Sequence, residues 1–179
     1  MDRDNQQATC SEIAWLAGLM EGEGSISMTV AKNSQGDKPK LSFGIMLYNT
    51  DALIIKKAVE IMRLMGFEPN IIEKTQKPMM KADGSGHYFS RDPMLVVRIR
   101  TMTDILSFLT KLRPYLFGQK SARADLIMQL IKRRLDARSK AIGNSPRHNP
   151  VTEEDYELIR RYCELPGTRT KALQRVLND

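Results

Sequence analysis

Two glutamates stand among glycines where a predicted helix ends, in the stretch 21–24 with the sequence EGEG. The C-terminus of a helix carries unpaired carbonyl groups and partial negative charge, so Glu21 and Glu23 are unfavourable there unless a cation lies among them. Carboxylate and main-chain carbonyl oxygens are the ligands that Mg²⁺ prefers, and Gly22 and Gly24 leave the carbonyls free to point toward an ion. Paired divalent ions can drive phosphodiester hydrolysis. For an isolated stretch of this kind, an acidic turn between helix and strand is the alternative.

The helix before these acids carries a stripe of small residues. Ala14, Gly18 and Gly22 recur at every fourth position, which places them on one side of a helix, with Ala17 beside them. Small residues at this spacing let two helices approach closely, so we expect contact with the same helix of a second copy across a two-fold axis. Packing of this helix against the chain's own sheet is the alternative. A homodimer would bring two acidic helix ends together, which is unfavourable without metal ions.

The first half of the chain alternates helix and strand patterns. A helix from Ser11 to about Gly22 precedes two strands, 25–32 and 40–48, in which apolar residues recur with period two. The polar residues 33–40 form the turn region between them. A second helix over 52–65 begins after the capping side chains of 49–51 and ends at Gly66, where a left-handed residue is expected. This helix carries the apolar residues Leu53, Ile54, Val59, Ile61, Met62 and Met65.

The second half repeats this unit and then adds helices. Strands at 70–77 and 93–100, separated by a loop over 79–92, lead into a helix from Thr103 that Pro114 ends. A helix over 121–138 follows, with Lys132, Arg133 and Arg134 predicted on its outer side. The order αββαββα indicates an α+β fold with an antiparallel four-stranded sheet.

The C-terminal segment is predicted to be a set of accessory helices. Residues 143–150 are typical of a loop or linker, and 152–155 match a capping box that starts a helix reaching about Cys163. A last short helix is expected over 170–177. We therefore divide the chain into a core at 11–138 and accessory helices at 139–179.

Composition favours a globular protein with a polyanionic partner. The chain has 28 Lys and Arg against 21 Asp and Glu, a formal net charge of +7, which favours nucleic acid, although basic proteins without such a partner exist. Cys10 and Cys163 are far apart, and His87 and His148 stand alone, so the sequence offers no zinc site. No apolar run approaches the roughly 18 residues of a membrane span, and the polar start does not match a signal or transit peptide. We expect a soluble protein that is not secreted.

The stretch 16–24, with the sequence LAGLMEGEG, resembles the signature of the LAGLIDADG homing endonucleases. The order αββαββα over 11–138 resembles their core fold. One copy of the motif in a short chain is similar to the homodimeric branch, whereas the monomeric branch carries two copies. The final acid of the motif is usually Asp and is Glu23 here, a residue that active members can also carry. The segment 112–126 resembles the region where a basic active-site residue precedes the last core helix, and the C-terminal helices resemble accessory helices of some algal organellar members.

The resemblance implies roles for four residues. Glu23 would be the metal-binding carboxylate, with the Gly22 carbonyl as an additional ligand. Asn49 matches the place of a polar residue that organises water near the scissile phosphate, and its alternative is a helix N-cap. Lys120 matches the basic residue that positions solvent or neutralises developing negative charge, and its alternative is a solvated lysine at a helix start. Glu21 is expected to cap the helix end, to be solvated or to pair at the interface, without a catalytic role.

The sheet face opposite the apolar one is predicted to bind DNA. On the strand at 40–48, Leu41, Phe43, Ile45 and Leu47 would pack on helices and leave the alternate residues for the major groove. The predicted DNA-contacting residues are Lys40, Ser42, Gly44, Met46, Tyr48, Lys74, Gln76, Arg98 and Arg100, and the same parity exposes Val96. Expected phosphate contacts are Lys132, Arg133, Arg138, Lys140, Arg147, Arg169 and Lys171. A strand of ten residues spans about 33 Å, so a dimer would cover on the order of twenty base pairs. For each residue, an ordinary hydrated side chain is the alternative.

The resemblance implies a site-specific endonuclease that cuts both strands of a long pseudo-palindromic DNA target and so promotes the spread of the intron or intein that encodes it. The implied cofactor is Mg²⁺ or another divalent cation such as Mn²⁺, while Ca²⁺ could bind without supporting cleavage. The partners would be double-stranded DNA and a second copy of the chain, with no membrane. The expected location is the cytoplasm or nucleoid of a prokaryote or phage host, or an organelle interior. Two alternatives remain: an RNA-binding intron maturase and a non-cleaving DNA-binding regulator on the same fold.

Overall fold

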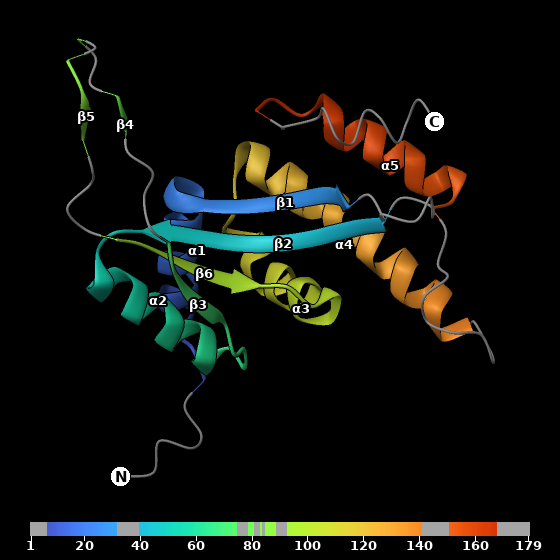
Figure 1. The fold of residues 1–179 in the computed structure, drawn as a ribbon. Coiled ribbons are helices and arrows are strands. Elements are labelled where there is room, and N and C mark those ends of the chain that lie inside the picture. Colours follow the sequence, from blue (N-terminus) through green and yellow to red (C-terminus); the bar gives the residue numbers. More distant parts are fainter. Residues whose placement is uncertain are drawn as a thin grey trace. The chain divides into compact units, whose positions relative to one another are not determined.

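The computed structural model describes residues 7–31, 40–74, 79–80, 83, 85–88, 93–140 and 151–167 (Figure 1). The main elements are α1 (Cys10–Glu23), β1 (Gly24–Ala31), β2 (Lys40–Asn49), α2 (Ala52–Leu64), β3 (Asn70–Lys74), β6 (Met94–Ile99), α3 (Met102–Leu112), α4 (Gly118–Lys140) and α5 (Glu153–Glu164). Shorter elements are β4 (Met79–Met80), β5 (His87–Tyr88) and the 3₁₀ helix η1 (Arg113–Tyr115). The predicted order of the main helices and strands, αββαββα followed by α4 and α5, is confirmed.

Four strands form one sheet in the order β1-β2-β6-β3. β3 runs antiparallel to β6, with a register from Asn70 opposite Arg98 to Lys74 opposite Met94. The predicted α+β fold with a four-stranded antiparallel sheet is confirmed. The chain divides into two compact units, the first made of Met1–Ser25 and Met46–Ile99 and the second of Ile26–Ile45 and Arg100–Asp179.

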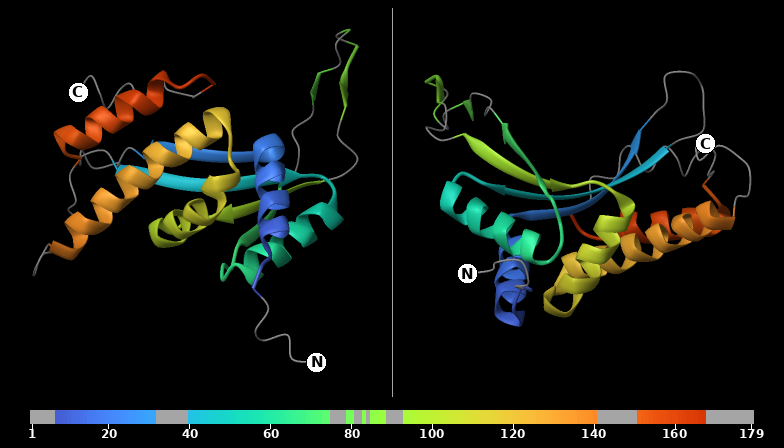
Figure 2. Two further views of the ribbon diagram at one scale, coloured as in Figure 1. Left: turned by 180° about the vertical axis from the view of Figure 1, so that it is seen from behind. Right: turned by 90° about the horizontal axis from the view of Figure 1, so that it is seen from below.

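In the first unit, α1 and α2 pack side by side, and α2 also packs on β6 (Figure 2). The Lys57 ammonium lies 4.4 Å from the centre of the Trp15 ring, which links the two helices by a cation–π contact. The predicted position of Gly66 is confirmed, since it ends α2 with a φ of 88°. The buried apolar residues of this unit are Leu16, Ala17, Met20, Leu47, Ile55, Ala58, Val59, Ile61, Met62, Met65, Phe67, Val96, Val97 and Ile99.

The apolar residues at the start of α2 do not all face the core. Leu53 is 76% exposed and Ile54 is half-buried, whereas Ile55 and Ala58 are buried. The residues Ile55, Ala58, Val59 and Met62 follow the spacing i, i+3, i+4, i+7 that defines one side of a helix. Leu53 precedes Ile55 by two residues, about 200° around the helix, so it faces solvent.

In the second unit, α3 packs on α4 and α4 packs on α5 (Figure 2). Arg113 holds Asp125 through two hydrogen bonds of 2.6 and 2.8 Å, which raises the pKa of the Arg113 guanidinium. The predicted capping box at the start of α5 is confirmed, since Thr152 and Asp155 each accept a hydrogen bond from the other's backbone amide. α5 lies in the same compact unit as α3 and α4, and the division into 11–138 and 139–179 stays a prediction.

The predicted exposure of two arginines on α4 is wrong. Arg133 is half-buried and pairs with Glu154 and Asp155, while Arg134 is 8% exposed and pairs with Asp155 at 3.5 Å. The hydrogen bonds that Arg133 donates to Glu154 and Asp155 raise its pKa, whereas burial lowers the pKa of Arg134. These two residues therefore hold α5 on α4 and are not free for phosphate contacts. Lys132 and Arg138 are exposed as predicted.

The segment 79–92 was expected to be a loop, and this expectation is wrong in part. Met79 pairs with Tyr88 and Met80 with His87 in a short antiparallel ladder, too brief to show a period of two in the sequence. The turn at 33–39, the strand end at 75–77, the linker at 143–150 and the helix at 170–177 lie outside the described residues. Among the described helices, none is long and apolar enough to cross a membrane.

Candidate functional site

The predicted acidic residues lie at the C-terminal end of α1. Thr9 caps the start of this helix, where its amide and hydroxyl donate to the Glu12 carboxylate at 2.7 and 2.8 Å and lower the pKa of that carboxyl. Fourteen residues later α1 ends at Glu23, which is exposed, and its last turn contains no basic residue. Glu23 therefore presents a carboxylate beside the negative end of the helix dipole.

Two glycines on the predicted stripe face open space. A Cβ built on Gly18 or on Gly22 would meet no heavy atom within 4 Å among the described residues, and both glycines are exposed. Ala14 is half-buried. Ala17 was expected beside this stripe as an interface residue, but it is fully buried in the chain's own core, so its methyl group is not available to a second copy. The part of the stripe that is open to a partner is therefore the helix surface at Gly18 and Gly22, next to Glu23.

Gly24 has a different role from Gly18 and Gly22. Its amide caps α1 by donating to the carbonyl oxygen of Met20, and its backbone then continues into β1. The two glycines of the EGEG stretch therefore have different roles: Gly22 leaves the helix surface open, and Gly24 lets the backbone pass close to Met20 where α1 ends.

Asn49 lies at the end of β2, and its predicted alternative as a helix N-cap is wrong. Its Oδ1 accepts a hydrogen bond of 2.8 Å from the Asp51 amide. The N-cap of α2 is Asp51, whose carboxylate accepts from the amides of Leu53 and Ile54. Asn49 therefore stabilises the turn before the cap with one oxygen. Its amide nitrogen can still donate a hydrogen bond to a water or a phosphate.

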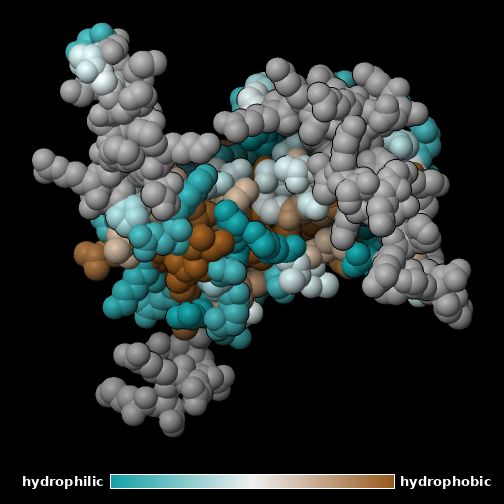
Figure 3. All heavy atoms as spheres, viewed as in Figure 1, coloured by the Kyte–Doolittle hydropathy of each residue, from teal (hydrophilic) through white to brown (hydrophobic). Residues whose placement is uncertain are grey.

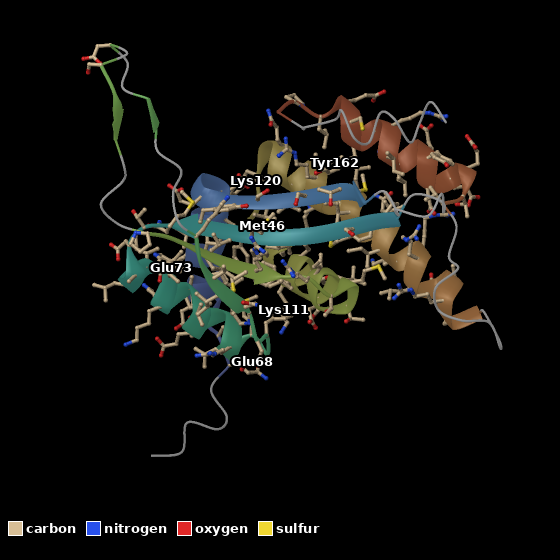
Figure 4. The ribbon with its side chains drawn as sticks, in the orientation of Figure 1. Met46, Glu68, Glu73, Lys111, Lys120 and Tyr162 are labelled. Atoms are coloured by element: carbon tan, nitrogen blue, oxygen red, sulfur yellow. The ribbon has the colours of Figure 1, made fainter. Side chains whose placement is uncertain are left out.

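Lys120 lies in the first turn of α4, half-buried, after Gly118 has entered the helix with a φ of 51° (Figure 4). It belongs to the second unit, whereas Glu23 and Asn49 belong to the first. The role of Lys120 beside Glu23 stays a prediction.

The register of β3 and β6 places the predicted DNA-contacting residues of these strands on one face. Asn70 is opposite Arg98, Ile72 is opposite Val96, and Lys74 is opposite Met94. Directly opposite residues of an antiparallel pair point to the same side of the sheet. Lys74 and Arg98 therefore share a face with Asn70 and Ile72, as the period-two pattern predicts. Figure 3 shows apolar side chains gathered over β6 and β3, with hydrophilic ones on either side.

Two residues of this face differ in exposure from what the sequence predicts. Val96 was expected to be exposed and is fully buried, because a central strand is flanked by side chains of both neighbours. Arg98 is half-buried, and its Nε is covered without a hydrogen-bond partner among the described residues. A covered guanidinium nitrogen without an acceptor is costly, so a ligand that supplies one would bind favourably. Arg100 is exposed just beyond β6.

β2 shows the predicted alternation along its length. Leu41, Phe43, Ile45 and Leu47 are buried, and the residues between them are half-buried. The Tyr48 hydroxyl donates to the sulfur of Met46 at 3.1 Å, so these two side chains lie on one face (Figure 4). Ser42 and Gly44 share this parity.

Several predicted DNA-contacting groups lie outside the described part of the chain. They are the side chains of Lys40 and Lys140 and the whole of Gln76, Arg147, Arg169 and Lys171.

The described residues of one chain contain no group of three or more His, Cys, Asp or Glu side chains that could hold a metal ion. Glu23 and the Gly22 carbonyl are the predicted ligands, and both belong to the exposed last turn of α1. Hard divalent cations prefer oxygen ligands of these two kinds. The donor types therefore fit a divalent cation.

Comparisons with solved structures identify the fold. The chain matches I-CeuI, a group I intron-encoded homing endonuclease solved with DNA, with a TM-score of 0.62 at 13% identity over 97% of this chain and 79% of that chain. It matches the LAGLIDADG homing endonuclease I-GzeII, in complex with its DNA target, with a TM-score of 0.60 at 16% identity over 91% of this chain and 47% of that chain. This chain has the LAGLIDADG homing-endonuclease fold.

A third match has nearly the same length as this LAGLIDADG-fold chain. The homing endonuclease I-CvuI, solved with its target in the presence of Ca, gives a TM-score of 0.54 at 18% identity over 93% of this chain and 94% of that chain. The chain thus spans nearly all of I-CvuI and about half of I-GzeII. No protein-family model and no curated protein matches it.

Three polar residues on the strands of the LAGLIDADG-fold sheet are missing from the sequence prediction. Ser27 and Thr29 alternate with the buried Ile26 and Met28 on β1, and Ser27 donates to the Gly44 carbonyl at 3.2 Å. The same period-two pattern that identifies β1 as a strand could have assigned them to its polar face. Asn70 is identified only by the register, because β3 begins with it and nothing in the sequence fixes its partner as Arg98.

Proposed function

We propose that this chain is a homodimeric, divalent-metal-dependent endonuclease that cuts both strands of a specific DNA target. The observation that carries the proposal is the exposed carboxylate of Glu23 at the end of α1, directly after a helix surface left open at Gly18 and Gly22. A second α1 packed on that open surface would bring its own Glu23 close to the first. The fold, shared with homing endonucleases solved with DNA, supports the same function.

In this proposal Glu23 and the Gly22 carbonyl are the groups of this chain that would hold a Mg²⁺ ion. When bound, the ion supplies charge stabilisation and an activated water for phosphodiester hydrolysis. The chain itself presents Glu23 at the exposed end of α1, where the Gly24 amide caps the helix. Asn49 would orient solvent through its amide, and Lys120 would stabilise negative charge on the phosphate.

The face of β3 and β6 supplies side chains for reading bases. Arg98 would bind the O6 and N7 acceptors of a guanine, and the adjacent Asn70 would bind a neighbouring adenine or a phosphate. Successive residues on one face of a strand are about 6.8 Å apart, which is about two base-pair steps. Ile72 therefore contacts a base about two pairs from the one that Arg98 reads, and its apolar side chain suits a thymine methyl group.

The test begins with selection of duplexes that the full-length protein binds from a random-sequence DNA pool. The selected duplex, cloned into a plasmid, is then incubated with protein in Mg²⁺, in Ca²⁺ and in EDTA. We expect double-strand cuts with Mg²⁺ and none with EDTA. Glu23→Gln should still bind the duplex but lose cleavage by at least about a hundredfold, in the range seen when a group that stabilises transition-state charge is removed.

The matched control is Glu21→Gln, which removes the other acid of the same helix end and should retain cleavage. Normal cutting by Glu23→Gln would remove the catalytic assignment. Binding without cutting in any divalent cation would identify a DNA-binding regulator. Binding of structured intron RNA in place of duplex DNA would identify a maturase.

A further inference from the structure

The hydroxyl of Tyr162, on α5, lies against the backbone of β1 (Figure 4). It accepts a hydrogen bond from the Met28 amide at 3.2 Å and donates one to the Ile26 carbonyl at 3.4 Å. The Tyr162 residue is 3% exposed, so water does not compete for the two hydrogen bonds of its hydroxyl. One side chain thus satisfies both a donor and an acceptor of the strand.

β1 is an edge strand of the sheet, and this explains why it needs such a partner. Residues two apart on a strand point their amide and carbonyl groups to the same side, so the groups of Ile26 and Met28 that Tyr162 binds lie on one edge. On the outer edge of a sheet these groups have no neighbouring strand. Tyr162 replaces that neighbour at one point, between the two buried side chains of Ile26 and Met28.

α5 is itself held firmly, so it can act as a fixed support for β1. Asp155, about two helical turns before Tyr162 on the same side of α5, is 3% exposed and pairs with Arg133 and Arg134 of α4. Leu158 and Ile159 are buried between these anchor points. Burial raises the pKa of the Tyr162 hydroxyl, which keeps it neutral and able to donate.

The polar face of β1 belongs to the surface that would contact DNA if the proposed function is right. Ser27 and Thr29 point away from the buried face, and Ser27 is bonded to Gly44 of β2. We propose that Tyr162 is a positioning residue for target recognition: it fixes the edge strand β1 so that Ser27 and Thr29 meet defined base pairs.

The experiment compares the full-length wild type with Tyr162→Phe, which removes the hydroxyl and keeps the ring. Binding is measured on the selected duplex and on variants with each base pair changed in turn. Thr29→Ala and Ser27→Ala first define which base pairs β1 reads, and Arg98→Ala defines one read by β6. We expect Tyr162→Phe to reduce discrimination about three- to tenfold at the β1 pairs, the effect of about one hydrogen bond, and to leave the Arg98 pair unchanged.

The matched control is Tyr156→Phe on the same helix, because no hydrogen bond of the Tyr156 hydroxyl is present among the described residues. It should leave the whole base-preference profile unchanged. Hydrogen exchange of the Met28 amide gives an independent readout that needs no DNA, and Tyr162→Phe should accelerate it at least about fivefold.

Three outcomes would overturn the proposal. Equal loss of discrimination at every base pair would mean that Tyr162 supports only general stability. An unchanged profile would mean that β1 is fixed without the hydroxyl. No effect of Thr29→Ala and Ser27→Ala at any pair would mean that β1 does not read the target. The proposed function fails separately, if the wild-type protein selects no duplex, and the Met28 exchange result still tests the contact in that case.

Discussion

The Gly24 amide donates to the carbonyl oxygen of Met20, and a Cβ on Gly24 would lie 2.6 Å from that oxygen and 2.5 Å from the Met20 Cε. Real Cβ atoms do not approach other heavy atoms so closely, so only glycine fits between the end of α1 and the start of β1. The Met20 side chain is fully buried and cannot move away without disturbing the core. The last glycine of the EGEG stretch is therefore required by the fold.

Gly24→Ala is expected to lower the free energy of unfolding by about 1 to 3 kcal/mol, the usual cost of forcing extra atoms into a packed site. Urea denaturation followed by circular dichroism measures this. A control is Gly22→Ala, two residues earlier, where the added methyl group meets open space. Equal stability of the two variants would contradict the role assigned to Gly24.

Gly18→Ala and Gly22→Ala should have opposite effects on folding and on assembly. Alanine is favoured over glycine inside a helix by about 1 kcal/mol, and neither added methyl group meets an atom of the described part of the chain, so α1 itself becomes more stable. A second α1 packed closely on this surface would be pushed away by the methyl groups. Sedimentation velocity over a range of protein concentrations should therefore show weaker dimerisation.

The control for these variants is Leu53→Ala, which removes an exposed side chain from α2 and should leave both folding and assembly nearly unchanged. Dimerisation of Gly18→Ala and Gly22→Ala with wild-type affinity would place the interface elsewhere. Because unfolding of a dimer depends on protein concentration, the stability comparison should be made at concentrations where every variant is monomeric.

The sequence predicts α2, α3 and α5 and the strand β2 well because their apolar residues recur with the period of a helix or a strand. The burial of Leu41, Phe43, Ile45 and Leu47 follows from alternation alone. The shared face of Lys74 and Arg98, which lie on different strands, follows from the register of β3 and β6. The start of α2 is different. Leu53, Ile54 and Ile55 are consecutive apolar residues, so hydrophobicity does not determine which of them faces inward. The position of the helix on β6 determines it.

Charged and polar residues are harder to place because their partners come from distant parts of the chain. Arg133 and Arg134 are residue types of an exposed helix face, and only the contact with Asp155 of α5 makes the burial of Arg134 favourable. In the stretch 49–51, Asn49 and Asp51 are equally good N-caps by residue type. The structure assigns the cap to Asp51 and the preceding turn to Asn49.

Arg98→Ala is expected to relax base specificity at one position of each half-site and to weaken binding of the best target by about 1 to 3 kcal/mol. Its Nε has no acceptor among the described residues, so little is lost within the chain itself. The exposed Lys132 on α4 offers a contrast. Lys132→Ala should weaken DNA binding uniformly across sequences, and it should reduce the salt dependence of the DNA affinity by the share of at most about one phosphate contact. A uniform effect of Arg98→Ala would contradict its role in base recognition.

Asp155→Asn should strongly destabilise the second unit. The carboxylate is 3% exposed and bonds Arg133 and Arg134, so the substitution leaves Arg134 as a buried charge with a weaker partner. Breaking such a pair typically costs about 3 to 5 kcal/mol. Glu154→Gln affects the same cluster from an exposed residue and should cost less than about 1 kcal/mol. Thermal unfolding of both variants distinguishes the two cases, and similar losses would contradict the assignment of Asp155 as the anchor.

Tyr162 should also make the stability of the protein sensitive to alkaline pH. Burial raises the pKa of its hydroxyl above the ordinary value of about 10, while the hydrogen bond from Met28 and the charge of Arg123 oppose this shift. The folded chain therefore holds the proton more tightly than the unfolded chain does. The resulting stabilisation is fully present below pH about 10 and is lost as the pH rises through the higher pKa of the folded state.

Tyr162→Phe removes this titration, so the stability difference between wild type and variant should shrink above pH about 10. Urea denaturation at a series of pH values from neutral to alkaline measures it, with Tyr156→Phe as the control. A difference that stays constant over this range would show that the Tyr162 proton is bound equally in both states.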